Sequence, residues 1–146
     1  MAQSVPTASL VPCLQLLPVG WSVAEVAVNN GRSLITLNHD RGGKRALVVG
    51  LTAACDPTVA TEVTSEHPGA RRSVRIDPTA PGFSATRAYD VPGGCVTQRF
   101  SAAAPKALRM SDTAATELGF ITRQELNLEM ERRSNGRLQL DPQQAS

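Results

Sequence analysis

The chain has 146 residues, 41% of them hydrophobic, and a net charge of +2 from 15 basic and 13 acidic side chains. This length suits one domain with its own core. Nucleic-acid-binding proteins usually show a strong basic bias, and this small net charge argues neither for nor against such a partner; we expect no nucleic-acid partner. Aromatic residues make up only 3% of the chain, which predicts a core of mainly aliphatic side chains.

Signals for a membrane segment or a metal site are weak. No apolar run approaches the roughly 20 residues that span a bilayer, and the first residues lack the basic and apolar regions of a signal peptide. We therefore expect either a cytoplasmic protein or an extracytoplasmic domain whose leader or anchor is missing from this sequence. The three cysteines show no CxxC spacing and only two histidines are present, so we expect no metal site and no cofactor.

The first half of the chain predicts strands joined by short turns. Residues 1–10 contain Ser, Ala and Pro without periodicity and predict a flexible linker. Residues 11–21 carry leucines between two prolines and predict a single turn packed on a sheet. Strand-like segments follow at 21–28, 32–39 and 45–54. Asn-Gly and Gly-Gly turns separate these three segments, which predicts an antiparallel meander.

The middle of the chain predicts a loop, a strand and a second loop. Residues 58–70 are polar and fit a loop or one helical turn. Residues 71–77 predict a short strand with Val74 and Ile76 directed inward. The sequence PTAPG at 78–82 predicts the second loop.

Residues 83–100, FSATRAYDVPGGCVTQRF, predict a β-hairpin with a Pro-Gly-Gly turn. With the turn centred on Gly93, Arg87 faces Arg99, and like charges on opposed residues destabilise a strand pair. We therefore expect an anion between them, either a carboxylate of this chain or a ligand, because guanidinium groups bind carboxylates and phosphates. The predicted ligand-binding residues are Arg75, Arg87, Tyr89 and Arg99. The alternative interpretation is a solvated face with internal ion pairs.

After residue 101 the apolar pattern changes from the period of a strand to that of a helix. Ser111 or Asp112 is expected to cap a short helix that ends near residue 118. Thr122 and Glu125 match a capping box and predict a second helix, which begins at residue 123.

Together these segments predict an α+β fold. Its antiparallel sheet has about six strands, a meander plus a hairpin, and C-terminal helices pack on one face. A last short strand is expected at 138–140. The expected single domain covers residues 11–142, between the flexible linker at 1–10 and a polar tail at 143–146.

The cysteines bear on the compartment of the protein. Cys55 and Cys95 lie just outside two predicted strands, and we expect a disulfide bond between them. Such a bond would contribute about 4 kcal/mol by constraining the unfolded chain. Cys13 would remain an odd thiol among leucines. The alternative is three reduced, buried cysteines in a cytoplasmic protein.

Few residues form a pattern that suggests catalysis. His39 is followed by Asp40 at the end of a predicted strand, and this pair is a candidate general base. No GxSxG or equivalent nucleophile motif is present, and His67 lies in a Pro-Gly loop. We therefore assign no catalytic residue, and a small hydrolase-like enzyme using His39 and Asp40 is kept as an alternative.

Three runs of the sequence carry a resemblance to a known group of proteins. NHDRGGKRALVVGLTAACD at 38–56, PGGCVTQRF at 92–100 and TRQELNLEMERRSNGRLQLDP at 122–142 resemble the extracytoplasmic domains of uncharacterised actinobacterial membrane-anchored proteins. The likeness covers most of residues 11–142. It implies an anchor N-terminal to residue 1 and an oxidising compartment, and it implies no catalytic residues.

The sequence thus predicts a non-catalytic, extracytoplasmic binding domain of a cell-envelope protein, either membrane-anchored or secreted. Its partner would be an anionic envelope component or another protein, held by an arginine-rich face of the sheet. Contact with a membrane would come only through an anchor absent from this chain. Alternatives are the hydrolase-like enzyme, a structural spacer, and a cytoplasmic location.

Overall fold

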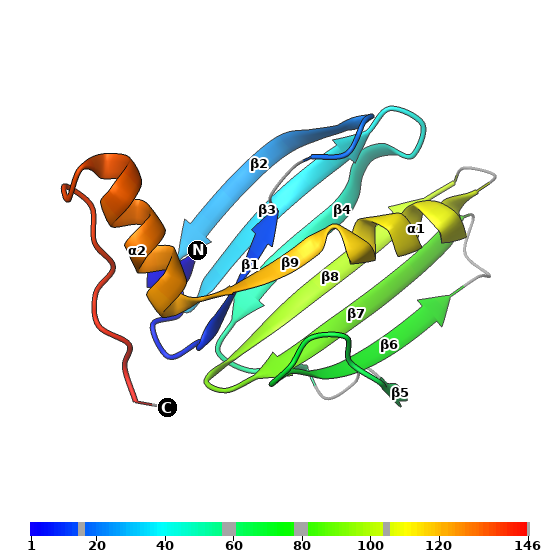
Figure 1. The fold of residues 1–146 in the computed structure, drawn as a ribbon. Helices are drawn as coiled ribbons and strands as arrows, with labels where there is room; N and C mark the ends of the chain where they lie inside the picture. The colour runs from blue at the N-terminus through cyan, green and yellow to red at the C-terminus, as the bar shows by residue number, and fades with distance from the viewer. Residues whose placement is uncertain (15–16, 57–60, 78–81, 104–105, 146) are drawn as a thin grey trace.

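The computed structural model describes residues 1–14, 17–56, 61–77, 82–103 and 106–145. Its strands are β1 (Leu10–Leu14), β2 (Trp21–Asn29), β3 (Arg32–His39), β4 (Gly43–Thr52), β5 (Thr61–Val63), β6 (Arg71–Asp77), β7 (Phe83–Val91), β8 (Gly94–Ala102) and β9 (Leu118–Thr122). Its helices are the short 3-10 helix η1 (Ala2–Ser4) and the α-helices α1 (Ala107–Thr116) and α2 (Arg123–Ser134). Seven strands form a large sheet in the order β2-β3-β4-β8-β7-β6-β5, and β1 pairs with β9 in a small sheet (Figure 1).

The predicted α+β fold with an antiparallel sheet is confirmed. Strands β2, β3 and β4 form the predicted meander, and β7 and β8 form the predicted hairpin. The large sheet has seven strands rather than about six, because Thr61–Val63, expected within a loop, pairs with β6. This short segment is too polar to show a strand pattern of its own. The predicted loop at 78–82 lies mostly outside the described residues.

The N-terminal segment belongs to the core, so the expectation of a flexible linker at 1–10 does not hold. Val5 and Ala8 are fully buried, and the backbone of Ser4 accepts a 2.7 Å hydrogen bond from Gly31. The segment expected to form a single turn after residue 10 begins instead with strand β1. Strand β1 exists because β9 offers it a partner from the other end of the chain, and no local pattern reveals such a pairing.

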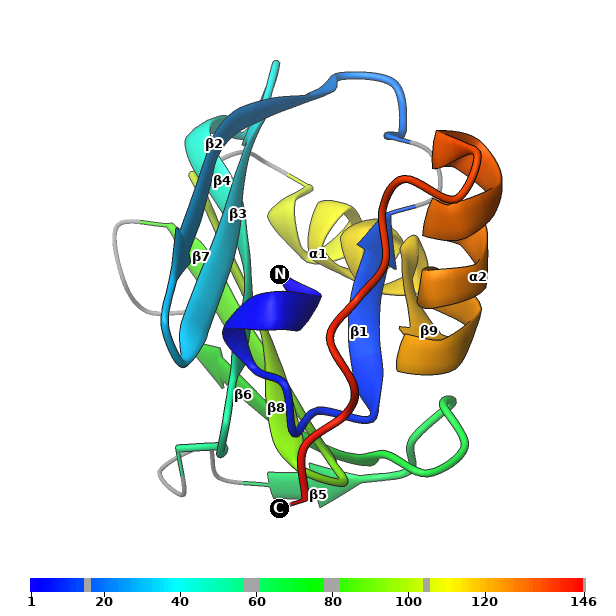
Figure 2. The same ribbon diagram turned by 90° about the vertical axis from the view of Figure 1, so that its left-hand side faces the viewer.

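The molecule is layered, as the edge-on view in Figure 2 shows. The large sheet forms one layer, and η1, β1, β9 and α1 lie against what we call its inner face. Helix α1 contacts β7 and β8, whereas α2 packs on β9. The prediction that both helices pack on one face of the sheet is therefore wrong for α2, which is the C-terminal helix. The small sheet separates α2 from the large one.

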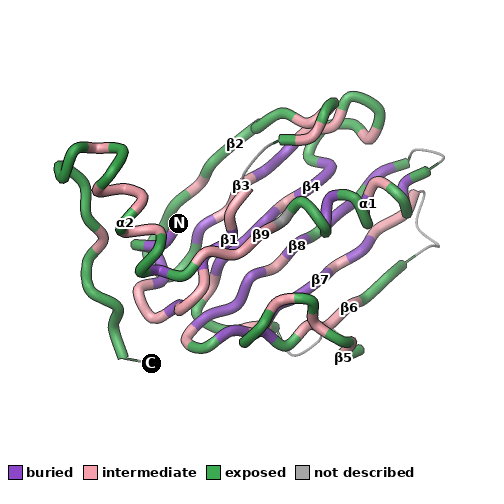
Figure 3. The backbone as a smooth tube through the Cα atoms, in the orientation of Figure 1, coloured by how far each residue is buried: buried purple, intermediate pink, exposed green. Residues whose placement is uncertain are grey.

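The hydrophobic core lies between the inner face and the layer that covers it. The register aligns Leu37 on β3 with Leu47 on β4 and Phe100 on β8, and all three side chains are buried. Figure 3 shows buried residues concentrated along the central strands, while α2 is mainly a mixture of half-buried and exposed residues and the C-terminal segment is mostly exposed. Burial of one such aromatic or aliphatic side chain contributes roughly 1.5–3 kcal/mol, so these rows hold the two layers together.

The two helices begin and end for different reasons. Helix α2 has the predicted capping box, in which the Thr122 hydroxyl accepts from the Glu125 backbone at 3.1 Å and the Glu125 carboxylate accepts from the Thr122 backbone at 2.9 Å. Helix α1 begins at Ala107, earlier than predicted, so Ser111 lies inside it and caps nothing. The strand expected at 138–140 does not form, and that segment is irregular.

The predicted disulfide bond between Cys55 and Cys95 is present, with the two Cα atoms 5.0 Å apart. Cys13 is the free thiol, half-buried on β1. Disulfide bonds are typical of oxidising, extracytoplasmic compartments. Among the described residues, neither helix has the length and apolarity needed to cross a bilayer.

Candidate functional site

The register of the β7–β8 hairpin decides where the predicted arginines point. Arg87 pairs with Gln98, and Thr86 pairs with Arg99. The turn therefore has two residues, with Gly93 at φ +72°, and not the three that place Arg87 opposite Arg99. Successive residues of a strand point to opposite faces. The prediction that Arg87 faces Arg99 is wrong, and the two side chains lie on opposite faces of the sheet.

Arg87 points to the inner face and is satisfied within the chain. Its residue is only 6% exposed, and its guanidinium donates to the Ser111 hydroxyl at 2.7 Å and to the Asp112 carboxylate at 2.8 Å. Both acceptors lie on α1. The anion expected beside Arg87 is thus a carboxylate of this chain, and Arg87 fastens α1 to the sheet rather than binding a ligand.

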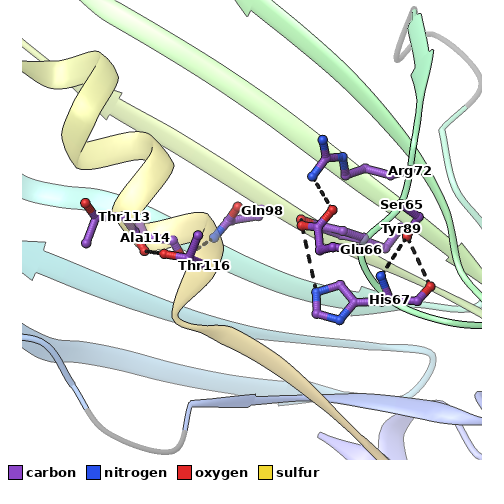
Figure 4. A network of polar contacts seen from close by, with 9 residues as sticks. All are labelled: Ser65, Glu66, His67, Arg72, Tyr89, Gln98, Thr113, Ala114 and Thr116. Atoms are coloured by element: carbon purple, nitrogen blue, oxygen red, sulfur yellow. Dashed lines mark hydrogen bonds and ion pairs between the residues drawn. The ribbon is translucent and has the colours of Figure 1, made fainter.

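Tyr89 also lies on the inner face, inside the polar cluster that Figure 4 shows. It is fully buried, and its hydroxyl donates to Glu66 at 3.4 Å, while Glu66 forms an ion pair with Arg72. The tyrosine ring meets the ring of Phe120 edge-on at 5.1 Å and that of His67 at 5.6 Å. Tyr89 is therefore a core residue with an internal hydrogen bond, and it offers no surface to a ligand.

The ionisation of Tyr89 should reveal this burial. Desolvation, and then the negative charge of Glu66, raise the pKa of Tyr89 above its usual 10.0, against the opposing effect of the guanidinium groups of Arg72 and Arg87. Tyr89 is the single tyrosine of the chain, so absorbance at 295 nm against pH follows it alone. We expect a midpoint above 10 in the native protein and near 10 in urea. A native midpoint at or below 10 would contradict the buried position.

The same shift links stability to alkaline pH. A pKa that is higher in the folded protein favours the protonated phenol there, so this contribution to stability is complete below pH 10 and declines as the pH rises further. Tyr89→Phe removes the ionisable group and should extend the stable range to higher pH. Thermal unfolding between pH 8 and 11.5, followed by circular dichroism, would measure the difference between the two proteins.

Two of the predicted binding residues do share a face. Arg75 on β6 and Arg99 on β8 both flank Thr86 on β7, and both point away from the core on what we call the outer face. Both are exposed, as is Arg32 on β3. We name these three residues the outer arginine face. Sequence reasoning missed Arg32, because only the strand order shows that β3 and β8 flank the same strand, β4.

The outer face carries a small recess beside Arg32 and Arg99. It has a volume of about 230 Å³ and is lined by Arg32, Leu34, Thr52, Ala54, Asp56, Thr97 and Arg99. Gly50 lies between Leu34 and Thr97, and a Cβ atom there would come within 2.8 Å of the Thr97 hydroxyl. The absence of a side chain at Gly50 thus leaves room for Leu34 and Thr97, which line the recess.

The arginines of the outer face differ in their partners. Arg71 is paired with Asp90, whereas no ion pair among the described residues includes Arg32, Arg75 or Arg99. Exposed guanidinium groups without internal carboxylates can form forked hydrogen bonds to an external carboxylate or phosphate. This arrangement can bind an anionic group, with Asp56 in the recess wall as an opposing charge.

His39 lines a different hollow, which we call the turn cavity. It has a volume of about 810 Å³ and is lined by His39, Arg41, Gly42, Gly43, Ala103, Lys106 and Met110. The Nδ1 atom of His39 accepts backbone hydrogen bonds from Arg41 at 3.1 Å and Gly42 at 3.0 Å. The neutral imidazole must then carry its proton on Nε2, which leaves no free lone pair for a general base. The geometry therefore disfavours the hydrolase-like alternative, and His39 stabilises the β3–β4 turn.

Metal-ligating side chains are scattered over the described part of the chain. Among the described residues, no group of three or more His, Cys, Asp or Glu side chains could hold a metal ion. The sulfur atoms of Cys55 and Cys95 are joined to each other. Comparisons of the chain with protein-family models, with curated proteins and with solved structures find no match.

Proposed function

We propose that this chain is a non-catalytic binding domain of a cell-envelope protein, and that it holds an anionic envelope component through the outer arginine face. The observation that supports this function is the position of Arg32, Arg75 and Arg99, which are exposed on one face and have no ion-pair partner among the described residues. Internal salt bridges would have favoured a solvated surface without a partner.

The spacing of these arginines suits a polymer better than a small molecule. Arg75 and Arg99 lie two strands apart, which corresponds to about 10 Å across a sheet. The recess between Arg32 and Arg99, about 230 Å³, is smaller than the usual 300–1,000 Å³ of small-molecule pockets. Several separated guanidinium groups on an open face match the repeated charges of an acidic polymer.

The proposed location is extracytoplasmic, on a membrane-anchored protein. The disulfide bond between Cys55 and Cys95 supports an oxidising compartment. The resemblance to extracytoplasmic domains of actinobacterial membrane-anchored proteins supports an anchor outside this sequence. A polyanion of the cell envelope would be within reach of a domain held there.

Charge reversal on the outer arginine face tests the proposal. The triple variant Arg32→Glu, Arg75→Glu, Arg99→Glu should bind immobilised poly-L-glutamate at least about tenfold more weakly than the native chain. Each exposed ion pair contributes roughly 0.5 kcal/mol, and reversal adds a repulsion of similar size. Surface substitutions of this kind leave stability within roughly 0.5 kcal/mol. Affinity would be measured by biolayer interferometry at low ionic strength.

The matched control reverses three charges at the opposite end of the fold. Arg132→Glu, Arg133→Glu and Arg137→Glu change the net charge equally, in and just after α2. All three residues are exposed, and the first two pair with Glu129 of the same helix. This variant should keep its affinity within about twofold. An equal loss in both variants would mean that net charge alone attracts the polymer, and no binding by the native chain would favour a structural spacer; either result rejects the proposal.

A further inference from the structure

The turn cavity lies apart from the outer arginine face and shares no lining residue with it. The turn between β3 and β4 contributes one side of the cavity, and Ala103, Lys106 and Met110 contribute the other. Its volume of about 810 Å³ falls within the range of natural small-molecule pockets. The turn cavity is separate from the disulfide bond, from the hydrophobic core and from the proposed polymer contact.

The lining combines positive charge with apolar surface. Arg41 and Lys106 are exposed at the cavity, and no ion pair among the described residues includes either of them. No carboxylate belongs to the described lining. Met110 and Ala103 supply apolar surface, and the ring of His39 supplies a further wall. Two cations beside apolar walls match a molecule with an anionic head and an apolar body.

Two local features keep the cavity formed. A Cβ atom on Gly42 would come within 2.8 Å of the Met110 methyl group, so the missing side chain lets Met110 lie against the turn. The two backbone hydrogen bonds to His39 Nδ1 fix the same turn from within. Trp21 then packs edge-on against His39, with ring centroids 4.7 Å apart. The cavity thus has a fixed wall, and the fluorescent side chain of Trp21 lies directly behind it.

We infer that the turn cavity is a binding site for an amphiphilic anion with a single carboxylate or phosphate head and a short apolar chain. Arg41 and Lys106 hold the head, and Met110, Ala103 and His39 contact the chain. This inference is independent of the polymer contact, since the two sites use different residues and each can fail without the other.

Calorimetric titration with octanoate, octyl phosphate and octylammonium tests the site. Both anions should bind with one-to-one stoichiometry, and their relative affinity distinguishes the two head groups, whereas octylammonium should bind at least tenfold more weakly. Trp21 is the single tryptophan, and its emission should change with the same midpoint as the heat signal. If octanoate binds and Trp21 emission does not change, the ligand lies elsewhere. If octylammonium binds as tightly as the anions, Arg41 and Lys106 do not hold the head group. Either outcome overturns the inference.

Three variants locate the site further. Arg41→Glu with Lys106→Glu should weaken octanoate binding at least tenfold. Ala103→Phe should weaken it equally, because the larger side chain fills the cavity, and Ala103 is exposed and lies outside the core. Lys44→Glu with Arg109→Glu is the matched control, because these exposed residues lie nearby but outside the described lining. It should stay within threefold of the native chain. A control that loses as much affinity as the first variant overturns the inference.

Discussion

Replacing both Cys55 and Cys95 by alanine will lower the free energy of unfolding by about 4 kcal/mol. The two residues are 40 positions apart, and a cross-link of that length removes about this much conformational entropy from the unfolded chain. Urea unfolding of the native and double-variant proteins, followed by circular dichroism, measures the difference. Native protein kept in reductant should behave like the double variant.

The size of this effect follows from what the disulfide encloses. Between Cys55 and Cys95 the chain forms β5, β6 and β7, which make up one side of the large sheet, and β8 then returns beside β4. The bond joins the two ends of this excursion near the pair Thr52 and Cys95. Without the disulfide bond, packing alone must offset the entropy lost when the chain between residues 55 and 95 folds back on itself.

Cys13→Ala provides the control for loss of a sulfur atom. Cys13 is half-buried and free, so its replacement should cost less than about 1.5 kcal/mol, which is the scale of a small change in buried apolar volume. Mass spectrometry after blocking free thiols should give one modified thiol in the native protein and three after reduction. A double variant as stable as the native chain would contradict the role given to the disulfide.

Arg87→Ala will cost about 3 kcal/mol of unfolding free energy, whereas Arg99→Ala, one strand away, will change it by less than about 0.5 kcal/mol. Removing the Arg87 side chain leaves the fully buried Ser111 hydroxyl without its donor and opens a cavity under α1. Arg99 is exposed and has no ion pair among the described residues. The same chemical change is therefore expected to destabilise the protein on the inner face of the sheet and to have little effect on the outer face.

Urea unfolding of both variants measures this contrast, and equal losses would contradict the assignment of faces. If Arg87→Ala fails to fold, Arg87→Leu combined with Ser111→Ala gives a second test. Replacing both buried partners by apolar groups removes the unsatisfied hydroxyl, so this double variant should recover most of the lost stability. Asp112 remains largely solvated in it, since its side chain is 61% exposed.

Much of the candidate binding surface could be predicted from the sequence, but only as a set of arginines. The sequence predicts one site of Arg75, Arg87, Tyr89 and Arg99. The register places Arg75 and Arg99 on one face and Arg87 and Tyr89 on the opposite, buried face. The predicted turn has three residues and the observed turn has two. This difference of one residue changes the register, and the register decides which residues of the two strands share a face. Arg32 joins the surface only through the pairing of β4 with β3 and β8.

The sequence by itself determined the features that depend on neighbouring residues. Alternating apolar residues and glycine turns produce the β2–β3–β4 meander and the β7–β8 hairpin, because strand pattern and turn geometry act over a few positions. The capping box of Thr122 and Glu125 starts α2 for the same reason. The pairing of Cys55 with Cys95 could be predicted because each lies near the end of a predicted strand.

Only the tertiary structure decided the features that join distant parts of the chain. Strand β1 forms because β9, about one hundred residues later, completes its hydrogen bonds. Ala2, Ser4, Val5 and Ala8 are buried because that pairing brings the N-terminal segment onto the core. Arg123, just after β9, donates to the Ala2 carbonyl at 2.7 Å and secures this arrangement. Such contacts depend on the folded position of both partners, which a short window of sequence does not contain.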